Sequence, residues 1–130
     1  MCTRFIFVGD HDTVITGRNM DWREDMQTNL WVLPRGMARV GATGKNAIQW
    51  TARYGSLVAS AYDLGTADGT NEKGLVASLL YLTESDTGLP DKRPVLSGSL
   101  WAEYALDNLA TVNEAVREFA NDAFFLVQQE

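Results

Sequence analysis

Cys2 is the only cysteine of the chain and stands directly behind Met1, so removal of Met1 would leave a thiol and a free α-amine on one residue. The unperturbed pKa values of these two groups, about 8.5 and about 8, are close, and a proton passes between them at little cost. The single histidine, His11, lies in a predicted turn, which gives little support to a Ser/His/Asp or Cys/His mechanism. Cys2 therefore indicates a cysteine nucleophile that carries its own base; the alternative is a small residue packed as a minor hydrophobe.

A β-hairpin is predicted to return the chain to Cys2. Residues 3–8 (TRFIFV) and 13–18 (TVITGR) are rich in β-branched and aromatic residues on both faces, which is typical of strands covered on each side. The Gly-Asp-His-Asp segment between them has the composition of a turn. A loop of these four residues places Cys2 opposite Asn19, to within one position.

The same register brings two charged side chains to the thiol. It places Arg18 opposite Thr3, with Asp21 close behind, and directly opposite residues of a hairpin lie about 5 Å apart. A guanidinium there favours the thiolate, and a carboxylate holds or orients the α-amine. Alone, Arg18 and Asp21 would more often form a modest surface ion pair, and their convergence on the N-terminus is what favours a role in catalysis.

Three segments that span most of the chain resemble the choloylglycine hydrolase family, which contains penicillin V acylases and bile salt hydrolases. These motifs are long, ordered and correctly spaced, so chance is a poor explanation for them. The segments are Met1-Cys2-Thr3-Arg4, Gly17-Arg18-Asn19-Met20-Asp21-Trp22 and Asn71-Glu72-Lys73-Gly74-Leu75. The last segment is expected to be a connecting turn that positions the strand after it.

The resemblance implies an enzyme whose N-terminal nucleophile is Cys2. Arg18 and Asp21 would be the immediate partners of the nucleophile, and the backbone N–H of Tyr81 would donate a hydrogen bond to the oxyanion. The reaction would pass through an acyl-enzyme, with the α-amine moving the thiol proton to the leaving nitrogen before water releases the acid. No metal or organic cofactor is implied, and the sequence has no cluster of His and Cys ligands for a transition metal.

The implied substrate is a linear, non-peptide amide with a hydrophobic acyl group. Bile salt hydrolases tend to have asparagine where this chain has Tyr81, whereas penicillin V acylases have an aromatic residue. Met20 and Trp22 are the other expected substrate-binding residues; Trp22 resembles the Gram-negative acylase branch, and simple core packing is its competing role. The expected order of preference is penicillin V, then an N-acyl homoserine lactone, then a conjugated bile acid.

The chain departs from the family in its length. Members are considerably longer, and in them the second oxyanion donor and a further active-site arginine lie beyond this stretch. Residues 1–130 are therefore expected to form the incomplete N-terminal portion of a single domain, in a homo-oligomer or paired with the missing C-terminal portion. The alternative to an active enzyme is a catalytically inactive fragment that serves as a scaffold for a complementary chain.

The composition is that of a soluble domain and argues against several classes of partner. A net charge of −6, with scattered Lys and Arg, argues against nucleic acid. No apolar stretch approaches the roughly 20 residues that cross a bilayer, and no signal-peptide pattern precedes Cys2. The expected location is the cytoplasm, with the periplasm as the alternative if a signal peptide has been removed.

Beyond the hairpin the sequence predicts further strands. Residues 35–46 and the Gly-, Asp- and Asn-containing segment 63–74 are expected to be loops between them. The strands are expected over residues 29–34, 47–50, 56–62, 75–82 and 124–127.

Residues 96–120 change to a helical period. Thr111-Val112-Asn113-Glu114 has the form of a capping box that begins a second helix. One face of the first helix is marked by Leu100, Trp101, Tyr104, Ala105 and Leu109, of which Trp101 and Tyr104 are expected to pack the helix on the sheet. The predicted class is α+β, and the resemblance implies the four-layer αββα sandwich of the N-terminal nucleophile hydrolases.

Overall fold

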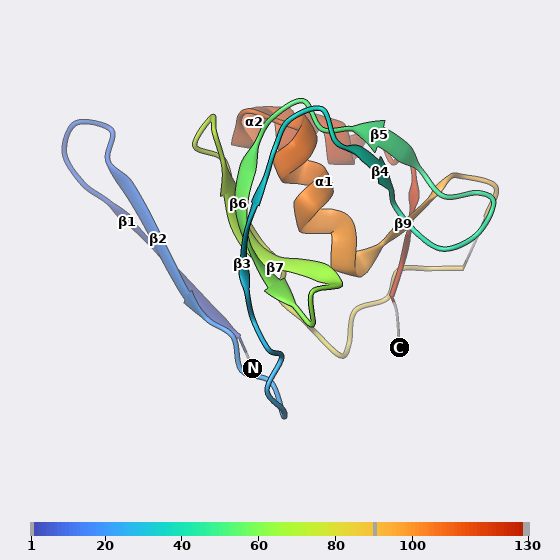
Figure 1. Cartoon of the computed structure of the whole chain (residues 1–130), viewed down its shortest axis with the longest axis horizontal. Helices are drawn as coiled ribbons and strands as arrows, with labels where there is room; N and C mark the ends of the chain where they lie inside the picture. The colour runs from blue at the N-terminus through green and yellow to red at the C-terminus, as the bar shows by residue number, and fades with distance from the viewer. Residues whose placement is uncertain (1, 90, 129–130) are drawn as a thin grey trace.

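A four-stranded antiparallel sheet with a helix on one face forms the centre of the structure (Figure 1). The computed structural model describes residues 2–89 and 91–128, so the predicted removal of Met1 lies outside the described residues. The strand order is β3-β6-β7-β8, and α1 (Trp101–Asn108) packs against β7 and β8. The strands are β3 (Leu30–Leu33), β6 (Ser56–Ala61), β7 (Gly65–Asn71) and β8 (Val76–Ser78).

Two-stranded sheets and a second helix surround this centre. The pairs β1-β2 and β4-β5 are antiparallel, whereas β9 and β10 run parallel. The elements are β1 (Thr3–Val8), β2 (Val14–Asn19), β4 (Ala38–Val40), β5 (Gln49–Thr51), β9 (Val95–Ser97), the 3-10 turn η1 (Gly98–Leu100), α2 (Val112–Ala120) and β10 (Phe125–Val127). The predicted strands at 3–8, 29–34, 56–62 and 124–127 are confirmed to within one residue at each end.

Several short elements differ from the prediction. β4 lies inside the predicted loop 35–46, and β9 lies where helical periodicity was expected to begin. The strand predicted over 47–50 corresponds to β5, which begins two residues later. The strand predicted over 75–82 corresponds to β8, which ends already at Ser78. Strands of three residues carry almost no periodic signal, because their stability depends on partners distant in the sequence.

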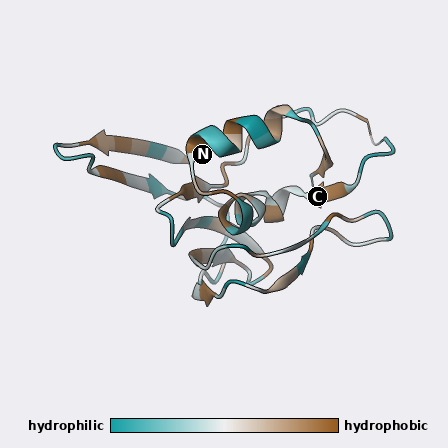
Figure 2. Ribbon diagram, turned by 90° about the horizontal axis from the view of Figure 1, so that it is seen from above, coloured by the Kyte–Doolittle hydropathy of each residue, from teal (hydrophilic) through white to brown (hydrophobic). Residues whose placement is uncertain are grey.

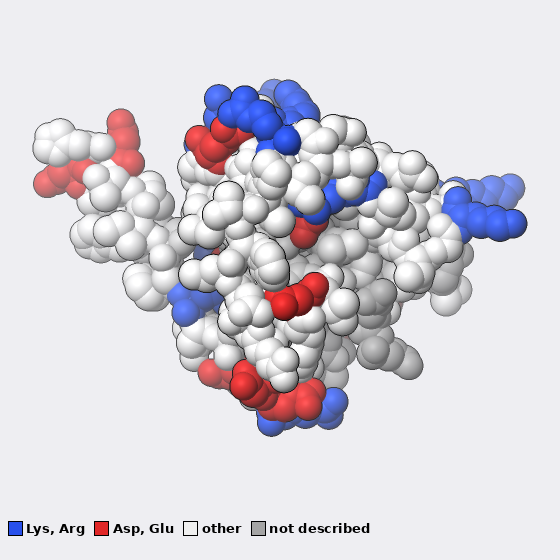
Figure 3. Space-filling model, viewed as in Figure 1, with Lys and Arg blue, Asp and Glu red and all other residues white. Residues whose placement is uncertain are grey.

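The hairpin β1-β2 projects from the centre as an arm (Figure 1). Phe5 and Ile6 point to opposite faces of β1 and are 60% and 59% exposed, so both faces of the arm are open. The view from above shows the same arm with brown, apolar segments on both strands (Figure 2). In the space-filling view the arm is white along its length and acidic at its tip (Figure 3).

The register of the hairpin differs by one position from the predicted one. Thr3 lies opposite Asn19, because the loop contains five residues instead of four. The Gly9 N–H donates to the Thr13 carbonyl at 2.8 Å, which keeps Thr13 in the loop. His11 and Asp12 take up the left-handed conformation, with φ of 57° and 59°, that closes it.

The segment predicted as a loop after residue 62 forms β7, and this is the main correction to the predicted fold. Its sequence, GTADGTN, has little intrinsic preference for a strand. Its small side chains are what the packing requires, because a Cβ on Gly69 would lie 2.8 Å from the Leu106 side chain and 2.8 Å from the Leu57 carbonyl oxygen. Close approach of α1 to the sheet therefore outweighs the unfavourable propensity.

The core lies between α1 and the sheet. Leu106 is fully buried, and Leu75, Ala105 and Leu109 form a cluster beside it. Tyr104 is also buried, with its ring edge-on to Trp50 of β5 at 5.2 Å. The prediction that Tyr104 packs its helix against a sheet is confirmed.

The predicted capping box at the start of α2 is confirmed. The Thr111 hydroxyl accepts a hydrogen bond from the Glu114 N–H at 3.1 Å. The Glu114 carboxylate in turn accepts from the Ala110 N–H at 2.8 Å. Backbone donors that the first turn leaves without helical partners are satisfied in this way.

Asn71 joins the end of β7 to the end of α1. Its amide donates to the carbonyls of Leu106 and Leu109 at 2.8 and 2.7 Å, which the helix itself leaves unsatisfied. Its Oδ1 accepts from the N–H groups of Lys73 and Leu75, which shapes the turn into β8. The predicted connecting turn therefore also fixes the helix on the sheet.

The other face of the sheet is open. Leu30 and Val32 of β3 are 73% and 78% exposed there, next to the half-exposed Leu57 of β6. The described residues thus form a mixed α and β fold, and they do not by themselves form the expected four-layer sandwich. Neither helix in residues 2–89 and 91–128 is long and apolar enough to cross a membrane.

Candidate active site

Cys2 lies at the base of the hairpin arm, directly before β1. Its thiol is free and partly buried. The register that pairs Thr3 with Asn19 pairs Arg4 with Arg18, and continuing it by one position places Met20 opposite Cys2. Cys2 and Arg4 are two residues apart and therefore share a face, and Arg18 lies directly opposite Arg4. Cys2 and Arg18 thus lie on the same side of the hairpin.

Arg18 links the hairpin to the central sheet. Its Nη1 donates to the backbone carbonyl oxygens of Ala67 and Leu79, both at 2.8 Å. Its Nε donates to the carbonyl of the neighbouring Asn19 at 3.4 Å. The predicted partner of the thiol is therefore also the residue that docks the hairpin on the segment leading to Tyr81.

Asp21 follows the end of β2 and is held by Asn19. The amide nitrogen of Asn19 donates to the two carboxylate oxygens of Asp21 at 3.1 and 3.3 Å. The Oδ1 of the same amide accepts from the Thr3 N–H at 2.8 Å. Sequence reasoning predicted Asp21 and gave Asn19 no role, although Asn19 belongs to the same motif.

The structure brings together Trp22 and Tyr81, which the sequence predicted as a substrate-binding residue and an oxyanion donor. Their rings meet edge to face with centroids 5.7 Å apart. Both remain exposed, at 43% and 57%, and so offer aromatic surface to a ligand. Such a pair is a suitable surface for an aromatic or aliphatic acyl group.

Tyr62 holds Trp22 from the other side, and sequence reasoning missed it. The Trp22 indole N–H donates to the Tyr62 hydroxyl at 3.0 Å, and that hydroxyl donates to Glu24 at 2.9 Å. Desolvation and the Glu24 carboxylate raise the pKa of Tyr62, which keeps the hydroxyl protonated as a donor. Its place at the end of a predicted strand, next to a loop, was the available signal.

The turn that presents Tyr62 is fixed by Asp63. Both residues have positive φ, 54° and 53°, a conformation that ordinary side chains adopt at a cost. The Asp63 carboxylate accepts from Trp31 at 2.8 Å, Ser60 at 2.7 Å and Asn29 at 2.9 Å. Hydrogen bonds from these groups, that of Trp31 first, lower the pKa of Asp63.

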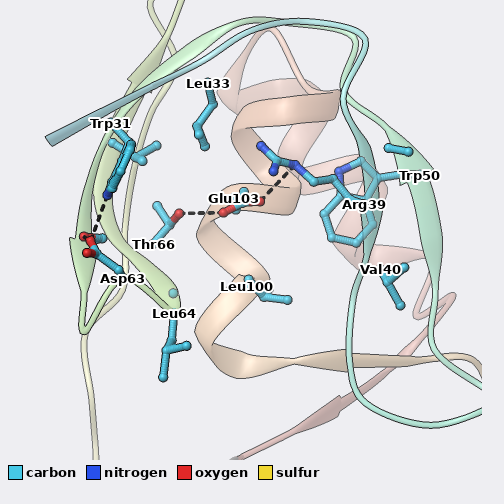
Figure 4. A pocket seen from close by; sticks show the side chains of 14 residues that line it. Trp31, Leu33, Arg39, Val40, Trp50, Asp63, Leu64, Thr66, Leu100 and Glu103 are labelled. Carbon is cyan, nitrogen blue, oxygen red and sulfur yellow. Dashed lines mark hydrogen bonds and ion pairs between the residues drawn. The ribbon is translucent and has the colours of Figure 1, made fainter. Parts of the chain in front are cut away.

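A separate cavity of about 420 Å³ lies on the helix side of the sheet (Figure 4). Its wall carries a polar network in which Glu103 accepts from Thr66 at 2.9 Å and pairs with Arg39 at 3.0 Å. Arg39 and Trp50 also bind the fully buried Asp107, whose pKa is raised by burial. These bonds tie β4 and β5 to α1, which gives the network a structural role.

No group of three or more His, Cys, Asp or Glu in the described part of the chain is arranged to hold a metal ion. The candidate site thus consists of a free thiol, a guanidinium, a carboxylate and an aromatic pair. The carboxylate, the guanidinium and the residue after Cys2 are joined through Asn19. Such a set suits nucleophilic attack by a thiol on a carbonyl group.

Comparison with known proteins gives consistent matches. The sequence profile of the linear amide C-N hydrolases, choloylglycine hydrolase family, matches residues 2–128. A penicillin V acylase from Pectobacterium atrosepticum is 45% identical over 139 residues, covering 99% of this chain and 37% of that protein. The structure of penicillin V acylase from Agrobacterium tumefaciens aligns with a TM-score of 0.92 at 50% identity, over 98% of this chain and 40% of that one.

A more distant structure shares the fold. The C2A mutant of conjugated bile acid hydrolase from Clostridium perfringens aligns with a TM-score of 0.72 at 22% identity. The alignment covers 98% of this chain and 39% of that one. The chain therefore spans about two fifths of the length of the relatives that it matches.

Proposed function

The chain belongs to the choloylglycine hydrolase family of linear amide C-N hydrolases, and from this premise we propose that the whole protein is a penicillin V acylase-like amide hydrolase. The substrate is a linear, non-peptide amide with a hydrophobic acyl group. Penicillin V is the preferred class, followed by N-acyl homoserine lactones and then conjugated bile acids. The aromatic pair Trp22–Tyr81 is the observation that carries this order.

In the proposed mechanism, Cys2 is the nucleophile once Met1 has been removed. The thiolate attacks the amide carbonyl, and the α-amine of Cys2 takes up the thiol proton. Collapse of the tetrahedral intermediate passes that proton to the leaving nitrogen, which departs as an amine and leaves a thioester. Water then cleaves the thioester, which releases the acid and restores the thiol.

The other predicted residues have distinct tasks in this mechanism. Arg18 stabilises the thiolate, since a fixed guanidinium favours the charged form of a nearby thiol. Asp21 orients the α-amine, and the Tyr81 N–H donates to the oxyanion. A donor of this kind contributes about 10²–10³ in rate.

Trp22 and Tyr81 favour an aromatic acyl group. Both residues keep exposed surface beside their edge-to-face contact, and a third ring can pack against aromatic surface of this kind. A phenoxyacetyl group presents such a ring directly beside the amide. Met20, which directly follows the Thr3–Asn19 pair at the end of β2, would add a flexible apolar side chain to the binding site.

The relatives contain a further portion that this chain does not match. We also propose that the corresponding portion of the whole protein covers the open sheet face and supplies the second oxyanion donor. The exposure of Leu30 and Val32, at 73% and 78%, supports a partner for that face. The exposure of both faces of the β1-β2 arm supports a second contact between this chain and that portion. This portion would either continue the same polypeptide or pair with it.

The test uses the full-length protein with a verified N-terminus. Wild type and Cys2→Ser are compared for release of phenoxyacetic acid from penicillin V, with circular dichroism and intact mass measured on both. We expect active wild type to lack Met1 and Cys2→Ser to keep the fold while losing turnover, because a hydroxyl is far less acidic than a thiol. Turnover that survives Cys2→Ser, or active enzyme that retains Met1, would contradict the mechanism.

A further inference from the structure

The side chain of Asn19 bridges two parts of the candidate site. Its Oδ1 accepts from the Thr3 N–H at 2.8 Å, and its Nδ2 donates to the two oxygens of Asp21 at 3.1 and 3.3 Å. The Thr3 nitrogen belongs to the peptide plane that also contains the Cα of Cys2. One planar amide therefore fixes the backbone of the nucleophile relative to the carboxylate.

A carboxamide is the side chain that this bridge needs. It offers an acceptor on one arm and donors on the other, whereas an ionised carboxylate only accepts. The acceptor meets a backbone donor of β1, and the donors meet a carboxylate on the chain beyond β2. Neither end can be exchanged for the other without losing a hydrogen bond.

We infer that Asn19 is a positioning residue of the proposed reaction, which couples the orientation of Cys2 to that of Asp21. The inference rests on the proposed function. Asn19 need not touch the substrate; it acts by holding the carboxylate that orients the α-amine. Its loss would therefore lower the rate of the chemical step more than it would weaken substrate binding.

Other charged groups surround this bridge and define what a pH experiment would report. On the hairpin they are Arg18, which donates to the Asn19 carbonyl, and Arg4 directly across from it. On the sheet, Asp68 lines the cavity beneath the hairpin and is bonded to Ser78 at 2.7 Å. A recovery of kcat at acid pH that appears in Asn19→Asp and is absent from Asn19→Ala would therefore report the introduced carboxyl pair.

The decisive variant is Asn19→Asp in the full-length enzyme. An ionised aspartate there still accepts from Thr3 but faces Asp21 as a like charge. Two carboxyl groups that share a site bind one proton tightly, and the protonated group can again donate. We expect kcat to fall roughly ten- to a hundredfold at neutral pH, and to recover as the pH is lowered, because a positioned acid–base group contributes about 10²–10⁴ in rate.

Asn19→Ala supplies the comparison without a titrating group. It should lower kcat to a similar extent at neutral pH, leave KM within about twofold, and show no recovery at acid pH. If Asn19→Ala fails to fold by circular dichroism, the profile of Asn19→Asp decides the question alone, because a folding defect does not produce recovery at acid pH.

The chain offers a matched control in a second Asn–Asp pair. Asn29 donates to the two carboxylate oxygens of Asp63 at 3.1 and 2.9 Å, the same chemistry at a different place in the fold. Asn29→Asp should lower the thermal midpoint, since it creates the same like-charge contact. It should not produce recovery of kcat at acid pH.

The outcomes separate this inference from the proposed function. Turnover that does not need Cys2 overturns both. In an enzyme that needs Cys2, Asn19 variants with the wild-type kcat and pH profile overturn the inference alone. The inference is also overturned if Asn19→Asp loses activity only in proportion to its loss of stability and shows no recovery at acid pH, which is the behaviour expected of Asn29→Asp.

Discussion

Arg18 donates a hydrogen bond to the carbonyl oxygen of Leu79 at 2.8 Å, and so joins the hairpin that begins directly after Cys2 to the backbone just before Tyr81. The second bond from the same nitrogen, to Ala67, anchors this contact on β7. One nitrogen reaches both carbonyls at once because Nη1 carries two N–H bonds. Docking of the hairpin by Arg18 is thus separable from the proposed effect of its charge on the thiol.

Substitution of Arg18 should separate these tasks. Arg18→Ala should lower kcat and move the pH optimum upward, because the cation that favours the thiolate is lost. Arg18→Lys keeps the charge but replaces the planar guanidinium, whose Nη1 and Nε donate to three carbonyls, by a freely rotating ammonium, so it should restore much of the pH profile but not the docking of the hairpin. The measurements are pH–rate profiles and hydrogen exchange of residues 3–19, with the exposed helix variant Arg117→Ala as control; an unchanged profile in Arg18→Ala would contradict the role.

Trp22→Ala should weaken transition-state binding of phenoxyacetyl substrates by about 1–3 kcal/mol, the scale of a lost apolar contact. The control is Val116→Ala, since Val116 is an exposed apolar side chain on α2 and belongs to none of the contacts of the candidate site. Val116→Ala should leave kcat/KM of the folded enzyme near wild type. Equal effects of the two variants, or a wild-type preference for glycine-conjugated bile acids, would contradict the acylase-like pocket.

Asn71→Ala should destabilise the fold by at least about 2 kcal/mol, because it leaves buried carbonyl and N–H groups without partners. Asn113 on the exposed side of α2 provides the control, and Asn113→Ala should change the free energy of unfolding by less than about 0.5 kcal/mol. Urea denaturation measures both. A neutral Asn71→Ala variant would mean that water replaces the four hydrogen bonds of its side chain without loss.

Asp63→Asn should change how stability depends on pH. Hydrogen bonds lower the pKa of Asp63 from its ordinary value of 3.8, so the folded state favours the carboxylate. The resulting stabilisation is complete above the unfolded pKa and is lost as the pH falls through the folded pKa. The difference in Tm between wild type and Asp63→Asn should therefore be largest near neutrality and shrink in acid. A Tm difference that does not change with pH would contradict this role of Asp63.

The elements that were predicted correctly are those with a strong local signal. The hairpin is indicated by two apolar runs around a turn, and the start of α2 is indicated by the pair Thr111 and Glu114. β7 was missed because its strand character comes from packing under α1, which no local pattern of Gly65–Asn71 reveals. The register was one position out because a loop of four or five residues has nearly the same composition.

The candidate site was predicted in part. Residues carried by long motifs, such as Arg18 and Trp22, were predicted as site residues, and the structure places the Trp22 ring against that of Tyr81. The contacts of Asn19 with Thr3 and of Tyr62 with Trp22 join residues 16 and 40 positions apart, and only the folded chain creates them. A motif indicates candidate site residues more readily than it indicates the residues that hold them in place.

The open faces of the hairpin arm have a consequence for how the protein behaves while it folds. The segment TRFIFV combines high β-propensity with a lack of proline, and both are features of segments that aggregate. Phe5 and Ile6 keep more than half of their surface exposed in the described part of the chain, so a partly folded protein would present an aggregation-prone strand to other chains. The free thiol of Cys2 is thus attached to a stretch that needs protection from other chains.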